Sequence, residues 1–298
     1  MSETAAEQGQ KVNMRRLAVP VLIGIGVSLY LIIGNFDPRA LENIRLTPKL
    51  VTGLGLALVA LLVRDFAFMY KIRLSTGEKL SWLKTVQTII MWEFGAAITP
   101  KLGEVAFTLY VLKRSGLSYG RSMAAILLNT FLDNVFFVIA FAVLYGMLGP
   151  QMLAVSADCS SLEGHRVMTA VRTLASEAWI GYAIICAAAI FFGVALFWLP
   201  HTTKRFFHKL SRLRWLSRLS SSLVHFGDEI EITAYEYKNR EWWFWIRMMI
   251  ATCFNWAARY LMVNAILYAF STGPLDMLEI FARQFVLWIF MIIPSTPG

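Results

Sequence analysis

The chain has 298 residues, of which 57% are hydrophobic and 16% are charged, and its mean hydropathy is +0.58. Soluble domains carry about 25% charged residues, so this composition excludes an ordinary soluble protein and indicates an integral membrane protein. The formal net charge of +9 would suit a nucleic-acid-binding protein. However, the basic residues gather in short segments between apolar runs, which is typical of the cytoplasmic face of a membrane protein. We therefore expect an anionic membrane surface as the basic segments' partner, and no nucleic acid.

Five apolar runs are long enough to cross a bilayer, which takes about 20 residues. They cover residues 17–34, 49–70, 122–148, 177–199 and 244–270. One basic cluster, which begins at Lys71, follows the second run, another precedes the third and another follows the fourth. The positive-inside rule places all three clusters in the cytoplasm. The first run then predicts a retained signal anchor, preceded by a cytoplasmic tail of residues 1–16. This orientation predicts a multi-pass protein of the cytoplasmic (inner) cell membrane with a cytoplasmic N-terminus.

Two apolar segments are interrupted by proline and glycine. Residues 82–112 have basic residues on both sides, so a full crossing would place one basic cluster outside. A re-entrant hairpin that breaks at Pro100 avoids this, because proline removes a backbone donor and clashes with the preceding turn. Residues 278–298, which end in Pro294-Ser295-Thr296-Pro297-Gly298, predict a second hairpin that enters from the opposite face. The alternative for each break is a kinked helix that crosses the membrane.

The order of these elements predicts an all-α, polytopic helical bundle with an inverted-repeat-like arrangement and two oppositely oriented re-entrant hairpins. We expect one integral membrane domain, residues 1–298, in which residues 17–199 hold the N-terminal helices and the first hairpin. Residues 244–298 begin a second unit that lacks its return arm, so the natural protein is expected to continue beyond Gly298. Paired broken helices of this kind are typical of a transport site.

The segment 200–243 between the two units is expected to lie in the cytoplasm. Its apolar residues recur at helical spacing with basic residues between them; they are Phe206, Leu210, Leu213 and Leu216. This pattern predicts either an interfacial amphipathic helix on the anionic leaflet or a helix packed on the bundle.

Charged residues inside predicted membrane segments are the main candidates for a binding site. Each Arg, Lys or Asp at the bilayer centre costs roughly 2.5–3.5 kcal/mol, so such residues usually pair or line a cavity. Arg259 and Asp133 lie near the middle of two predicted spans, and we expect them to contact each other, either as a structural ion pair or as part of a transport site. At the first break, the N-terminus of the returning arm near Gly103 is suited to phosphate, and Lys101 would add a positive charge.

The remaining candidates are acidic or have a local partner. Glu93 lies in the first arm of the hairpin and Glu104 lies at its break. Together with Asp133, they would balance charge or carry coupling protons. Arg283 lies four residues after Glu279, so an intrahelical pair is the alternative to a role in the site. Arg64, near the cytoplasmic end of its span, is expected to extend to the lipid headgroups.

The sequence contains few of the motifs that are typical of an enzyme. The four histidines have no metal-ligand partner at a useful spacing; they are His165, His201, His208 and His225. The motifs H-E-x-x-H and G-x-S-x-G and the P-loop are not found. The acidic cluster Asp228, Glu229 and Glu231 is expected to pair with nearby basic residues. We therefore expect no catalytic residue, no metal and no cofactor.

The motif Pro100-Lys101-Leu102-Gly103-Glu104, followed by Leu112-Lys113-Arg114-Ser115-Gly116-Leu117-Ser118 and Asp133, resembles the lysylphosphatidylglycerol synthase transmembrane region, or flippase-like domain, family. The terminal Thr296-Pro297-Gly298 resembles the start of that family's second signature, and the resemblance runs from about residue 15 to the end. It implies a polytopic helical fold with re-entrant segments and a role in moving lipids or lipid-linked headgroups across the bilayer.

The chain departs from the family's pattern at several positions. Lys101 stands where members commonly carry Arg, and Phe107 where they often carry a further Arg. Asn129 and Thr130 stand where Glu and Arg often precede the aspartate. No soluble aminoacyl-transfer domain is attached in this sequence, so the lysyl-transferase activity in the family's name is not inferred for it.

The residues and the resemblance together predict a flippase-like transporter that moves a phospholipid or a lipid-linked anionic headgroup across the cytoplasmic membrane. The expected partner is an anionic phospholipid or a polyisoprenoid-linked lipid, and a homo-oligomer is possible. Headgroup phosphate would enter a polar cavity between the hairpins. The candidate substrate-binding residues are Glu93, Lys101, Gly103, Glu104, Asp133, Arg259, Arg283, Pro297 and Gly298. The alternatives are a membrane-embedded enzyme acting on a lipid-linked substrate and a non-transporting scaffold.

Overall fold

The computed structural model describes residues 46–98, 101–153, 164–198, 201–202, 204–205, 209, 220–271 and 273–292, together with residues 26 and 30. Its helices are α3 (Pro48–Ser75), α4 (Trp82–Ile98), α5 (Lys101–Arg114), α6 (Tyr119–Leu148), α7 (Gly164–Gly193), α9 (Ser220–Lys238), α10 (Trp242–Phe270) and α11 (Met277–Ile292). A short 3₁₀ helix, η1 (Gly149–Leu153), follows α6, and a π-helical turn, η3 (Val194–Trp198), extends α7. These described residues contain no strand, which confirms the predicted all-α class.

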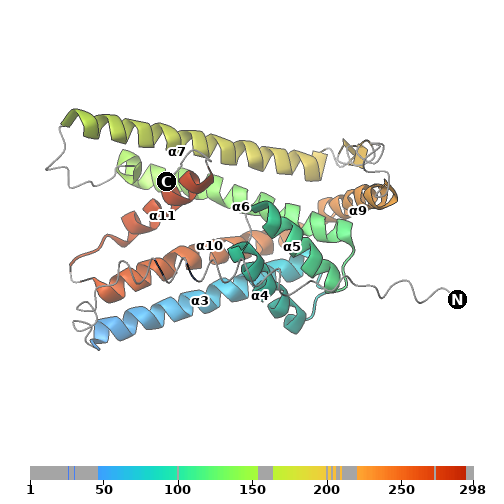
Figure 1. The fold of residues 1–298 in the computed structure, drawn as a ribbon, viewed down its shortest axis with the longest axis horizontal. Coiled ribbons are helices and arrows are strands. Elements are labelled where there is room, and N and C mark those ends of the chain that lie inside the picture. Colours follow the sequence, from blue (N-terminus) through green and yellow to red (C-terminus); the bar gives the residue numbers. More distant parts are fainter. Residues whose placement is uncertain are drawn as a thin grey trace.

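The bundle places α3 and α7 on opposite sides, with α6, α10 and α11 between them (Figure 1). Within the residues that the structure describes, three helical stretches are long and apolar enough to cross a membrane: Pro48–Ser75, Tyr119–Leu148 and Ser176–Trp198. They match three of the five predicted spans. α3 also exposes large apolar side chains along its length, including Leu58, Leu62 and Phe66, as expected of a surface that faces lipid.

The other two predicted spans have different outcomes. α10 covers the predicted run 244–270, but it is not among the three apolar stretches, and its tryptophans, asparagines and arginines lower its hydropathy. It packs along α3 and also contacts α6 and α11, so much of its surface faces protein rather than lipid. The predicted span 17–34 lies outside the described residues except for two positions.

α3 is longer than its hydropathy predicted. It begins at a Thr47 N-cap, whose side chain accepts a hydrogen bond from the Leu50 amide, with Pro48 in the first turn where its missing donor is harmless. It continues past residue 70 to Ser75, where Thr76 caps it and Gly77 turns the chain with a φ of 67°. Lys71 was expected in the cytoplasmic loop, but the helix carries it into the bundle.

α3 and α10 run antiparallel and lie close together (Figure 1). At one end the Lys49 ammonium donates to the Ser271 carbonyl at 2.5 Å, and at the other Leu74 packs in one cluster with Phe244. Gly53 permits the close approach, because a Cβ placed there would lie 2.6 Å from the Cβ of Ala269 and 2.8 Å from its Cα. This contact fixes how α10 sits against α3.

α4 and α5 form the helical hairpin expected from the break at Pro100. They have 17 and 14 residues and pack against each other, and α4 also contacts α3 while α5 contacts α6. Both are shorter than the roughly 20 residues that cross a bilayer. Re-entry into the membrane from the cytoplasmic face stays a prediction. For the second hairpin, α11 supplies the first arm, whereas the break at residues 294–298 lies outside the described residues.

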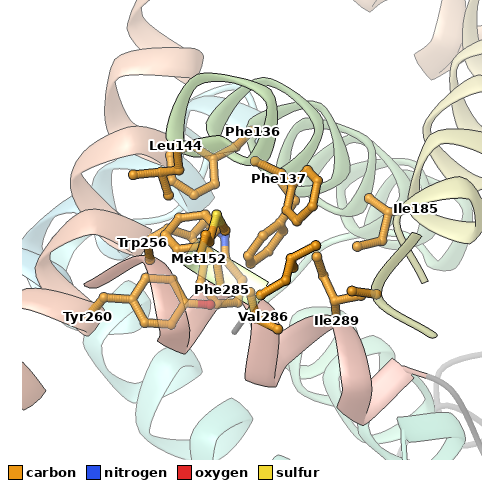
Figure 2. Packing of buried hydrophobic residues seen from close by; sticks show 14 residues of the cluster. Phe136, Phe137, Leu144, Met152, Ile185, Trp256, Tyr260, Phe285, Val286 and Ile289 are labelled. Carbon is orange, nitrogen blue, oxygen red and sulfur yellow. The ribbon is translucent and has the colours of Figure 1, made fainter. Parts of the chain in front are cut away.

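An aromatic core joins α6, α7, α10 and α11 to η1. Figure 2 shows its buried side chains, including Phe136, Phe137, Trp256, Tyr260 and Phe285. The Phe137 and Trp256 rings lie 4.6 Å apart in an edge-to-face arrangement, which is among the favourable geometries of aromatic pairs. This packing holds Trp256 firmly on the inner face of α10.

α9 is packed on the bundle at the start of α6. The Glu229 carboxylate accepts a hydrogen bond from the Gly120 amide at 2.8 Å, where a negative charge suits the N-terminus of a helix. Arg121 and Glu236 form an ion pair at 2.5 Å. α9 is therefore packed against the bundle, whereas the choice between an interfacial and a packed helix for the preceding amphipathic pattern stays a prediction. Phe206, Leu210, Leu213 and Leu216 lie outside the described residues.

Candidate functional site

A buried ion pair lies at the meeting point of α3 and α6. The Lys71 ammonium lies 2.5 Å from Asp133 Oδ1, and the side chains are 1% and 28% exposed, respectively. Asp133 is near the middle of α6, one of the three apolar helical stretches. Because removing one partner would leave an uncompensated buried charge, each of these side chains depends on the other.

Trp256 of α10 adds a hydrogen bond to the ion pair. Its indole Nε1–H donates to Asp133 Oδ1 at 2.7 Å, so the same carboxylate oxygen accepts from both Lys71 and Trp256. Lys71 Nζ also lies 3.4 Å from the Asn129 carbonyl oxygen. Three helices thus each contribute one side chain to the site, and hydrogen bonds to a charged carboxylate are stronger than those between neutral groups. We call Lys71, Asp133 and Trp256 the central cluster.

A hydrogen-bond chain connects the central cluster to α9. The Asn129 side chain donates to Ser75 Oγ at 3.0 Å, and the Tyr237 hydroxyl donates to the Ser75 carbonyl at 2.5 Å. Asn129 lies one turn before Asp133, and Ser75 lies one turn after Lys71, so the polar groups of α3 and α6 face each other. Asn129 Oδ1 is buried without a hydrogen-bond partner in the described part of the chain. Buried polar groups therefore extend from α9 to the ion pair.

Burial raises the pKa of the Tyr237 hydroxyl above its ordinary value, since ionisation would place a charge between α9 and the bundle. The hydroxyl consequently stays protonated and keeps its donor role. The hydrogen bonds that the Lys204 ammonium donates to Asp228 and then to Glu231 raise the pKa of Lys204. Glu231 also pairs with His201. Asp228 and Glu231 of the acidic cluster thus pair with basic residues, as the sequence predicted, whereas Glu229 accepts from the Gly120 amide.

Replacing Tyr237 by phenylalanine is expected to lower the free energy of unfolding by about 1–3 kcal/mol, because the buried Ser75 carbonyl would lose its donor. Thermal unfolding of the purified protein in detergent measures this change. Tyr235→Phe is the matched control: its hydroxyl contacts His201 on the exposed side of the same helix, so its effect should stay within about 0.5 kcal/mol. Equal effects of the two variants would contradict a special role for the Tyr237 contact.

The predicted contact between Arg259 and Asp133 is not formed. Asp133 is satisfied by Lys71 and Trp256, while the exposed Arg259 guanidinium lies 5.4 Å from the centre of the Trp256 ring. Trp256 therefore separates the two charges. The prediction failed because Lys71 was placed in a loop, which left Arg259 as the apparent counter-charge within the membrane.

A second charged group links α3 to the hairpin. Arg64 donates from Nε and Nη2 to Asp65 Oδ1, at 2.9 and 2.7 Å, and its Nη2 lies 3.7 Å from the Glu93 carboxylate of α4. The Arg64 side chain is 16% exposed, whereas both carboxylates are 40% exposed. Arg64 is therefore engaged by protein groups, in contrast to its expected extension to the headgroups. Glu93 joins Arg64, not the central cluster.

The remaining candidates lie in or near the helical breaks. Lys101, Gly103 and Glu104 occupy the first turn of α5, as expected for the start of a returning arm, and their side chains lie outside the described part of the structure. Pro297 and Gly298 also fall outside it. Arg283 forms the intrahelical ion pair with Glu279. Among the residues that the structure describes, no three His, Cys, Asp or Glu side chains are grouped to hold a metal ion.

Lys71 and Trp256 are the two members of the central cluster that sequence reasoning missed. The signal for Lys71 was the capping pattern of α3, since Thr76 followed by Gly77 marks a helix end five residues later than hydropathy suggests. Trp256 lies three residues before Arg259, on a neighbouring part of the same helical face. Its aromatic character alone gave no sign of a polar contact.

A family model described as the lysylphosphatidylglycerol synthase TM region matches residues 17–298. No curated protein and no solved structure is significantly similar to the chain. The matched range includes every helix described above and all three members of the central cluster. By this match, which covers most of its length, the chain belongs to the lysylphosphatidylglycerol synthase TM-region family of membrane proteins.

Proposed function

We propose that this protein is a flippase-like transporter that moves the anionic headgroup of a lipid across the cytoplasmic membrane. The observation that carries the proposal is the Lys71–Asp133 pair, an ammonium and a carboxylate held 2.5 Å apart in apolar helices. Charged groups at membrane depth are expensive, and where they persist they commonly mark a substrate or ion pathway. The family to which the chain belongs is consistent with such a role.

The chemistry of the Lys71–Asp133 pair would allow a phosphate to replace the carboxylate as the partner of Lys71. Lys71 presents a compact positive charge that pairs with a single carboxylate oxygen, and a phosphate oxygen is an equivalent partner for an ammonium. In this proposal the headgroup phosphate takes the place of the carboxylate beside Lys71, while the acyl chains stay in the bilayer. The indole N–H of Trp256 supplies a further donor at the same point.

The hairpin of α4 and α5 is proposed to deliver the headgroup. The Arg64 guanidinium lies between Asp65 of α3 and Glu93 of α4, so a rearrangement of this group would release the hairpin from α3. The first turn of α5, with Lys101, supplies backbone N–H groups that have no acceptor within the helix and the positive end of a helix dipole, which favour phosphate. The substrate-binding residues proposed from sequence at this break keep that role.

The proposed substrate is an anionic phospholipid or a polyisoprenoid-linked lipid, and the proposed setting is the cytoplasmic membrane with the N-terminus inside. The basic loops support this orientation, since they attract the anionic headgroups of the cytoplasmic leaflet. We further propose transport without bond cleavage, so that the protein is not an enzyme.

The test is reconstitution of the purified protein into phosphatidylcholine vesicles that carry fluorescent phosphatidylglycerol. A membrane-impermeant quencher added outside then measures how fast inner-leaflet probe reaches the outer leaflet. We expect protein-dependent movement of the anionic probe, and slower movement of a phosphatidylcholine probe with the same label. Vesicles that contain protein but move neither probe faster than empty vesicles would contradict the proposal.

The same vesicles separate the proposed transporter from the two alternative classes of protein. A membrane-embedded enzyme would change the chemical identity of the lipid, which mass spectrometry of the extracted lipids detects. A scaffold would leave both the identity and the distribution of the probes unchanged. Transport with intact lipid is the outcome expected here.

A further inference from the structure

We propose that Asp133 binds a coupling proton: its carboxylate takes up one proton when an anionic headgroup replaces it beside Lys71. The inference rests on the proposed function, because it requires that a headgroup phosphate reaches Lys71. The inference adds a proton to the transport step and assigns that proton to the Asp133 carboxylate. The charges balance, since the pair is neutral before the exchange, and protonated Asp133 with a Lys71–phosphate pair is neutral after it.

The two oxygens of Asp133 have unequal surroundings. Oδ1 accepts hydrogen bonds from Lys71 and Trp256, whereas Oδ2 has no donor among the residues that the structure describes. The Asp133 side chain is 28% exposed, while that of Lys71 is only 1% exposed. Access to the ion pair is thus from the Asp133 side, because the Lys71 side chain is almost fully buried. A proton is small enough to reach Oδ2 without any movement of the helices.

This arrangement predicts an order of events. While Asp133 is ionised, it keeps Lys71 covered, so a headgroup has no free ammonium to bind. A proton on Oδ2 removes the charge that holds the pair together, and Lys71 becomes available for phosphate. Without the proton, the exchange would leave the Asp133 carboxylate between apolar helices without its counter-charge, which is unfavourable. Proton uptake and headgroup binding are therefore expected to occur together.

Few other charged groups surround Asp133. From α3 it faces Lys71, and from α10 it faces Trp256, beyond whose ring lies the exposed Arg259. The elements α7 and α11 contribute aliphatic and aromatic side chains to the adjoining core, including Ile185 and Phe285 (Figure 2). Within the described residues no second carboxylate forms a hydrogen bond or an ion pair with Lys71, so the proton is assigned to Asp133.

Proton uptake on lipid binding tests the inference directly. Water-soluble, short-chain phosphatidylglycerol is titrated into the purified protein in weakly buffered detergent with a pH-sensitive dye. We expect uptake of about one proton per bound lipid near neutral pH, and an affinity that rises about tenfold for each unit by which the pH falls. Binding without proton uptake and with constant affinity would overturn the inference while leaving the proposed function intact. Failure of the protein either to bind or to transport the anionic lipid would instead contradict the proposed function, and with it the inference.

Two variants assign the proton to a residue. Asp133→Asn is expected to bind phosphatidylglycerol without proton uptake and with an affinity independent of pH. Glu236→Gln is the matched control, because it removes an ion-paired carboxylate of α9 outside the central cluster, and its proton uptake should equal that of the unmodified protein. Proton uptake that persists in Asp133→Asn would overturn the assignment. If that variant does not fold, the pH dependence of the unmodified protein still decides whether a proton is coupled.

Discussion

Replacing Lys71 by methionine is expected to reduce transport of the anionic probe to the rate of empty vesicles and to destabilise the protein by about 3–5 kcal/mol. The side chain is 1% exposed and supplies the counter-charge of Asp133. Methionine has a similar length but no charge, so the carboxylate would keep only the Trp256 hydrogen bond. An uncompensated buried charge accounts for an effect of this size. The measurements are denaturant unfolding in detergent micelles and the vesicle assay.

The double variant Lys71→Met with Asp133→Asn separates stability from function. It removes both charges, so most of the lost stability should return, because a buried pair contributes little net free energy beyond matching its own charges. Transport should not return, since the ammonium that binds phosphate is still missing. Restored transport in the double variant would show that the pair only holds α3 and α6 together. Full transport in Lys71→Met alone would refute the proposed site.

Replacing Gly53 by alanine is expected to destabilise the protein by about 1–3 kcal/mol, the usual cost of overpacking a close contact. The added Cβ would lie 2.8 Å from the Ala269 Cα and 2.9 Å from the Ala265 carbonyl oxygen. Both are backbone atoms, so a side-chain rotation cannot relieve the clash and the two helices must separate. Thermal unfolding in detergent measures the loss, and replacement by valine should increase it.

Gly55→Ala is the matched control for this effect. Gly55 lies in the same helix, two residues further on, and a Cβ there would meet no atom within 4 Å. Alanine is a better helix former than glycine, so this variant is expected to be as stable as the unmodified protein or slightly more stable. If both alanine variants lose the same stability, the close contact between α3 and α10 is not the cause.

Much of the fold could be predicted from the sequence because its physical causes are local. Hydropathy over about 20 residues located α3, α6 and the membrane part of α7. Pro100 located the break between α4 and α5, since proline interrupts a helix whatever surrounds it. The spacing of Glu279 and Arg283 gave their ion pair, which a helix forms within one turn. The family signature added the class of membrane protein.

The partner of Asp133 could not be predicted in the same way. The sequence alone determined that Asp133 lies within an apolar span and needs a counter-charge, because an ionised group is expensive there whatever the fold. Which cation provides it depends on where α3 ends and on which helices are neighbours. Only the packing of α3, α6 and α10 makes Lys71 the partner of Asp133. The same packing places Trp256 in contact with both Asp133 and Arg259. A buried charge requires a partner of opposite charge, and tertiary contacts between distant segments determine which residue is that partner.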